Sequence, residues 1–184
     1  MKIKDIVFAS ANFLGNDRVA TYIESGYQVG NEAQTVDRLV RLANLVITEL
    51  SVSYVSAVFT ENVTFSEGKV LLSQFYLNPL KIVSVTDLNG NEIEFSTDGV
   101  YLRCGVGQAV VTYECYPMNM GLYDEINFSN PKLGAYTVAM AVAAEYCLTV
   151  CDFDCAVVWH EKYVEQLKAI TPLKNTYVKQ REWL

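Results

Sequence analysis

The sequence predicts an α+β fold in which helices at both ends of the chain flank a central run of antiparallel strands. Apolar residues recur with the helical period before residue 50 and again after residue 130. From residue 54 to residue 116 the period changes to two, and turn residues punctuate the segment. We therefore expect one α+β domain over residues 1–172, with helices over 1–50, a β-meander over 54–116 and a helical hairpin over 130–170. An extended arm is expected over 173–184.

The composition excludes several classes of protein. The chain has 184 residues, of which 51% are hydrophobic and 19% are charged, so it can bury a substantial core. Its net charge of -7 argues against broad binding of nucleic acid through phosphate contacts. No apolar run reaches the ~18 residues of a membrane span.

The first fifty residues predict three helices. Two short ones precede and follow the Gly15-Asn16-Asp17 break, the second over residues 18–24. The third begins at Asn31, which with Gln34 fits a capping box, and its apolar stripe ends near Leu50.

The middle of the chain predicts six strands, over residues 55–65, 69–72, 80–87, 92–95, 100–103 and 108–116. Asn89-Gly90 is typical of a tight hairpin in which both turn positions take positive φ. Such closely spaced strands predict a meander.

The helical hairpin is predicted from its end signals. Asn130 as cap and Pro131 at the first helical position indicate the start of one helix, and Val150 its end. Asp152 or Asp154 is expected to cap the next helix. On that helix Ala156, Trp159, Tyr163, Leu167 and Ile170 share one face.

Cys147, Cys151 and Cys155 offer a metal-binding alternative. On one continuous helix these thiols would share a face, and His160 could complete a zinc site. A helix break at Asp152 would scatter the thiols, and free buried cysteines are the simpler interpretation. The alternative function is a small cytoplasmic metal-binding or regulatory protein that uses this cluster.

The sequence supports no enzyme. His160 is the only histidine and lies on an amphipathic helix among charged neighbours. Neither a nucleophile elbow nor a phosphate-binding loop is present. We predict no catalytic residues, no cofactor and no metal.

The last residues predict a docking arm. Basic and aromatic side chains alternate there, and such residues contribute strongly to protein interfaces. The arm residues are Lys174, Tyr177, Lys179, Arg181, Trp183 and Leu184.

The C-terminal third resembles the head-to-tail connector (adaptor) proteins of tailed bacteriophages. The resemblance rests on AAEYCL at residues 143–148, on Ala156, Trp159 and Tyr163, and on the closing Lys179, Arg181 and Trp183. The resemblance covers about a third of the chain, and the strand-rich middle departs from purely helical connectors.

The resemblance implies a structural subunit of the virion neck, made in the host cytoplasm. Connectors form a ring, commonly of twelve copies, that joins the portal protein to the tail or to the next neck protein. Tyr136, Trp159 and Tyr163 would pack subunits together, the arm would enter the portal, and DNA would pass through the bore without sequence-specific binding and without a membrane partner.

Overall fold

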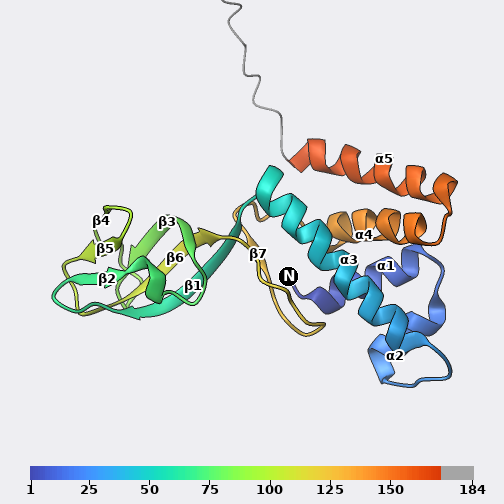
Figure 1. Ribbon diagram of the computed structural model, residues 1–184, viewed down its shortest axis with the longest axis horizontal. Helices are drawn as coiled ribbons and strands as arrows, with labels where there is room; N and C mark the ends of the chain where they lie inside the picture. Colours follow the sequence, from blue (N-terminus) through green and yellow to red (C-terminus); the bar gives the residue numbers. More distant parts are fainter. Residues whose placement is uncertain (171–184) are drawn as a thin grey trace, which may run out of the picture.

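The computed structural model describes residues 1–170, which form a helical body and a sheet body that lie end to end (Figure 1). Five α-helices make up the first body and antiparallel strands make up the second. The predicted α+β class is confirmed. The predicted arm over residues 173–184 lies outside the described residues.

The helical body combines the two ends of the sequence. Its helices are α1 (Ile3–Phe13), α2 (Asp17–Ser25), α3 (Glu32–Ser53), α4 (Ala135–Thr149) and α5 (Phe153–Ile170). Helix α4 packs against α1, α3 and α5 and is therefore buried on most sides. Its alanines allow close approach, and the Ser10 hydroxyl on α1 donates to the Ala139 carbonyl at 3.3 Å.

The sheet body contains two sheets. Its strands are β1 (Ala57–Thr64), β2 (Lys69–Leu71), β3 (Pro79–Thr86), β4 (Phe95–Thr97), β5 (Tyr101–Cys104), β6 (Gln108–Cys115) and the short β7 (Asn127–Phe128), with a 3₁₀ turn at Leu72–Gln74. The sheet orders are β3-β6-β1-β7 and β2-β5-β4, and every pair is antiparallel.

The strand order corrects the predicted meander. In a meander each strand pairs with the next along the chain, whereas β6 lies between β1 and β3. On β6, Ala109, Val111, Tyr113 and Cys115 alternate as buried residues, so this strand supplies one wall of the core. A buried central strand needs hydrogen-bonding partners along both edges, and those of β6 are β1 and β3, neither of which is next to it in the sequence.

The turn at Asn89-Gly90 also differs from the prediction. Only Gly90 has positive φ, at 88°. The Asp87 carboxylate accepts hydrogen bonds from the backbone N–H groups of Asn89 and Asn91 and from the Asn91 side chain. This carboxylate holds a wider loop over residues 87–91. Pairing with β3 resumes at the Thr86–Glu92 bridge and at the hydrogen bond from the Ile93 N–H to the Val85 carbonyl, but the regular strand β4 begins only at Phe95, three residues later than predicted.

At two of the three predicted helix starts, the side chain predicted to cap the helix does not do so. The Asn31 side chain makes no capping hydrogen bond. Instead the Glu32 carboxylate accepts from the N–H groups of Val29 and Gly30. Asn130 forms a turn with Lys132, and α4 begins only at Ala135. The Asp152 cap is confirmed, because its Oδ1 accepts from the Cys155 N–H at 3.2 Å.

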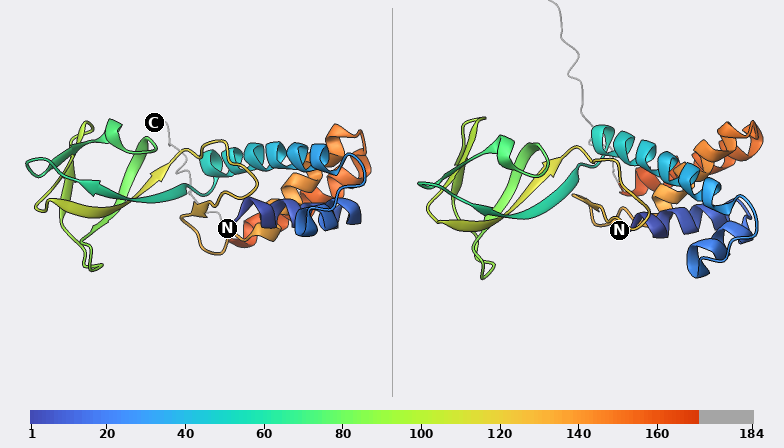
Figure 2. Two further views of the ribbon diagram at one scale, coloured as in Figure 1. Left: turned by 90° about the horizontal axis from the view of Figure 1, so that it is seen from below. Right: turned by 60° about the horizontal axis from the view of Figure 1, so that its bottom comes forward.

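The described residues bury two separate hydrophobic clusters, one in each body. The helical cluster takes residues from both ends of the chain, and the sheet cluster lies between Val63 and Cys115. The sheet body is thus an insertion between α3 and α4, as the two further views show (Figure 2). Strands β1 and β6 connect the two bodies.

Candidate assembly surfaces

An exposed apolar surface surrounds the turn between α4 and α5. Phe153 is 63% exposed and Val157 is 56% exposed, and residues four apart on a helix lie on the same face. We call this surface the hairpin patch, and its members are Leu148, Val150, Phe153, Val157 and Val158. Several large apolar side chains exposed around one turn make this a candidate interaction surface.

The three predicted packing aromatics occupy different environments. Tyr163 is only 5% exposed and belongs to the core of its own chain, so little of it remains for a neighbouring subunit. Trp159 is half-buried and stacks on Phe13 at 4.7 Å between ring centroids. Tyr136 is 69% exposed and lies beside the same Phe13 ring. Of the three side chains, Tyr136 is the most exposed and is therefore the most available to a neighbouring subunit.

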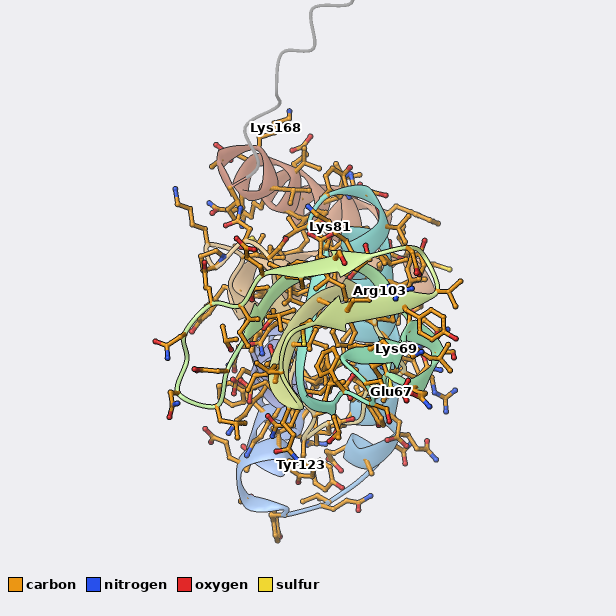
Figure 3. All side chains as sticks on the ribbon, turned by 90° about the vertical axis from the view of Figure 1, so that its left-hand side faces the viewer. Glu67, Lys69, Lys81, Arg103, Tyr123 and Lys168 are labelled. Atoms are coloured by element: carbon orange, nitrogen blue, oxygen red, sulfur yellow. The ribbon has the colours of Figure 1, made fainter. Side chains whose placement is uncertain are left out.

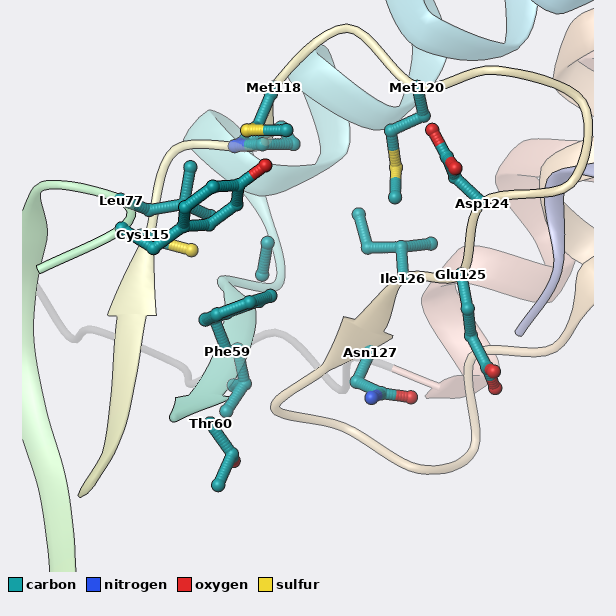
Figure 4. Close-up of a pocket in the computed structure, with 14 residues that line it drawn as sticks. Phe59, Thr60, Leu77, Cys115, Met118, Met120, Asp124, Glu125, Ile126 and Asn127 are labelled. Atoms are coloured by element: carbon teal, nitrogen blue, oxygen red, sulfur yellow. The ribbon is translucent and has the colours of Figure 1, made fainter. Parts of the chain in front are cut away.

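A groove of about 400 Å³ lies where the two bodies meet (Figure 4). One side carries Phe59, Leu77 and Cys115, and the other carries Met120, Ile126 and Asn127. Sequence reasoning missed this groove. The available signal was the Met- and Tyr-rich segment from Tyr116 to Tyr123, whose apolar residues follow no helical or strand period.

The acidic side chains at the groove already have partners. Asp124 Oδ2 accepts from the Gly121 N–H at 2.7 Å, and Glu125 contacts the Met1 amino group at 3.2 Å. Both carboxylates therefore have a structural role, because these contacts hold the loop that precedes β7. The groove is therefore an apolar surface with a fixed polar rim.

A buried tyrosine supports one wall of the groove. The Tyr113 hydroxyl donates to Glu61 Oε1 at 2.6 Å and accepts from the Leu77 N–H, while Glu61 also accepts from the Tyr76 N–H. Burial, with the hydrogen bond to Glu61 second, raises the pKa of Tyr113. The network fixes residues 76 and 77 against β6.

The sheet body is strongly acidic. Residues 57–115 contain seven carboxylates and three cations. Figure 3 shows Lys69 and Arg103 near Glu67 at one edge, and both cations lie over the Tyr101 ring. Lys69 pairs with Glu67 and Arg103 pairs with Asp98, so little positive charge is left for a phosphate.

Asp98 stays ionised over the physiological pH range. It accepts hydrogen bonds from Arg103 and from the N–H groups of Tyr101 and Val100. The hydrogen bond from Arg103, followed by that from Tyr101, lowers the pKa of Asp98 to about 2. The Asp98 carboxylate therefore keeps its charge at physiological pH, where the Arg103 guanidinium balances it.

The three cysteines of the α4–α5 hairpin are arranged differently from the prediction. The helix does break, with Cys151 at φ 60°, but the break brings Cys147 and Cys155 together instead of scattering them. Cys151 is exposed and is not part of the cluster, and His160 lies beside the Tyr163 ring. Burial, with the hydrogen bond to Cys155 second, raises the pKa of Cys147 to about 12.

The remaining predicted site residues belong to the arm. Lys174, Tyr177, Lys179, Arg181, Trp183 and Leu184 all lie outside the described residues. Their docking role stays a prediction.

Comparison with known proteins gives no assignment, since no family model and no curated protein matches this chain. Within residues 1–170, no helix combines the length and the hydropathy needed to cross a bilayer.

Proposed function

We propose that this chain is a structural subunit of the ring that joins head to tail in a tailed bacteriophage. The observation that carries the proposal is the hairpin patch, an apolar surface at one end of an elongated subunit. The resemblance of residues 143–183 to connector proteins agrees with this role. The subunit would act through contacts between copies in the assembled virion neck.

A closed ring requires heterologous contacts, in which one surface of a subunit meets a different surface of the next. The hairpin patch supplies one such surface, because burying a side chain like Phe153 is worth about 1.5–3 kcal/mol. Exposed Tyr136, at the opposite end of α4 from the turn, would supply a separate aromatic contact. The two-body shape leaves the sheet body available for a second partner in the neck.

The charge of the subunit suits a channel for DNA. Residues 171–184 hold three cations and one carboxylate, so removing them from the total of -7 leaves a net charge of -9 on residues 1–170. A bore lined by such a surface would repel phosphates at short range and would not retain the passing duplex. The basic arm would instead enter the portal.

The first test removes the hairpin patch without touching a core. In Phe153→Asp/Val157→Asp, charge replaces two exposed apolar side chains, so we expect ring formation to weaken by at least about tenfold, which corresponds to 1.4 kcal/mol. Leu88→Asp is the matched control, since Leu88 is 67% exposed but lies on the β3–β4 loop of the sheet body. Sedimentation velocity and electron microscopy measure the oligomer.

The oligomeric states of the wild type and the two variants either support or contradict the proposal. Loss of rings in the patch variant and their retention in Leu88→Asp supports the proposal. If the wild-type chain stays monomeric both alone and with portal protein, or if the patch variant forms rings normally, the proposal is wrong.

The second test concerns the arm. Deleting residues 174–184 removes the Lys, Arg and Trp side chains expected to bind the portal. We expect co-sedimentation with purified portal protein to be lost, while the circular dichroism of the subunit stays unchanged, because both clusters of buried residues lie within residues 3–167. Undiminished portal binding by the truncated chain would contradict the docking role.

A further inference from the structure

The turn between α4 and α5 gathers two thiols and a carboxylate. One ligand atom from each of Cys147, Asp152 and Cys155 lies within 4.8 Å of the others. Cys147 comes from the last turn of α4, Asp152 caps α5, and Cys155 lies in the first turn of α5. Three potential ligands from three parts of one turn thus converge.

The backbone of the turn holds this arrangement. The Asp152 N–H donates to the Cys147 carbonyl at 2.9 Å, and the Cys155 N–H donates to Asp152 Oδ1 at 3.2 Å. Both hydrogen bonds connect cluster members directly. The left-handed conformation of Cys151 reverses the chain between them and leaves that residue exposed.

We propose that Cys147, Asp152 and Cys155 form a binding site for a thiophilic divalent cation, with Zn²⁺ as the expected ion. Two sulfurs and one carboxylate oxygen match the donors that zinc prefers, at about 2.3 Å for sulfur and about 2.0–2.2 Å for oxygen. Three atoms within 4.8 Å of one another can surround one ion at those lengths after small side-chain rotations. Hard cations such as Mg²⁺ are disfavoured because they select oxygen donors.

The environment suits a bound cation. Cys147 is buried and Cys155 is half-buried, which shields the sulfurs, while exposed Asp152 leaves a route for the ion to enter. Water would supply the fourth ligand. A bound ion would connect the C-terminal end of α4 to the N-terminal end of α5 and would fix the turn of the hairpin.

The test is a zinc titration of the fully reduced protein against a chromophoric chelator. We expect one Zn²⁺ per chain, and Cd²⁺ in its place should produce the ultraviolet charge-transfer band of a metal–thiolate bond. Cys155→Ser should abolish this band or weaken binding by at least about tenfold, and Asp152→Asn should weaken binding while it preserves the helix cap. Cys151→Ser is the matched control and should bind as the wild type does.

Each result decides the question. Stoichiometric zinc lost in Cys155→Ser and kept in Cys151→Ser supports the site, provided that circular dichroism shows both variants folded. Absence of stoichiometric binding overturns it, as does equal loss in Cys151→Ser. Rapid air oxidation of Cys147 and Cys155 to a disulfide, in a reduced protein that takes up no zinc, also overturns it. The Asp152→Asn variant keeps both thiols, so the proposal can be tested even if a cysteine variant misfolds.

Discussion

Tyr113 and Tyr163 are both buried, but their hydroxyls differ in hydrogen bonding and therefore in their effect on stability. Tyr113 donates to Glu61 and accepts from Leu77. The Tyr163 hydroxyl is buried and has no hydrogen-bond partner among the described residues, and burial raises the pKa of Tyr163. A buried hydroxyl without a partner costs free energy, whereas a paired one stabilises the fold.

The two tyrosine-to-phenylalanine variants should therefore have opposite effects. Tyr113→Phe should lower the free energy of unfolding by about 0.5–1.5 kcal/mol, because it leaves Leu77 and Glu61 without that partner. Tyr163→Phe should leave this free energy unchanged or raise it. Urea denaturation of both variants, with the slope of each transition unchanged, measures the difference. Equal losses in the two variants would contradict the view that the Tyr163 hydroxyl is unpaired.

The cysteines show why a residue-level prediction can fail on correct premises. The sequence correctly predicted a helix break near Asp152. It could not predict that the reversal of the chain at Cys151 places residues 147 and 155 against each other. Spacing along the chain predicts contacts on a continuous helix, but contacts across a turn depend on the backbone conformation of one or two residues.

At the scale of elements, the positions of helices and strands followed from the sequence better than their ends and partners did. Five helices and six strands of the described part were predicted within a few residues, because their apolar periodicity extends over many positions. The helix caps depended on single polar side chains, and Glu32 rather than Asn31 satisfies the N–H groups before α3. Strand β7, with two residues, is too short to show any period.

The hairpin patch could have been predicted from the same helical period. Ala156, Tyr163 and Leu167 are buried on one face of α5, as expected. Val157 and Val158 lie off that face and are exposed, as the helical period places them. The face predicted for this helix contained only the buried stripe, so it did not include Val157 and Val158. The groove is different, because it depends on how two distant segments meet.

At the scale of the whole molecule, the sheet body is inserted into the helical body at two adjacent points. Ala57 and Cys115 are paired residues on β1 and β6, as are Val58 and Glu114, so the insertion leaves and rejoins the helical body at neighbouring positions. Paired residues on antiparallel strands lie about 4.5–5.5 Å apart. A two-residue turn can join strands at that spacing.

The helical body should therefore fold without most of the sheet. Replacing residues 59–113 by Asn-Gly keeps Ala57 and Val58, which pair with β7, and keeps the whole helical cluster. We expect the shortened chain to retain the helical circular dichroism signal and a cooperative thermal transition, since each body buries its own core. It should also retain self-association through the hairpin patch.

A shortened chain that loses its helical signal would show that the two bodies fold as one cooperative unit, as the predicted single domain over residues 1–172 implies. A shortened chain that folds but no longer associates would instead place the second half of the ring contact on the sheet body. The full-length Leu88→Asp variant provides the comparison, because it changes the sheet surface and preserves both cores. Folding and association are thus measured separately on the same pair of proteins.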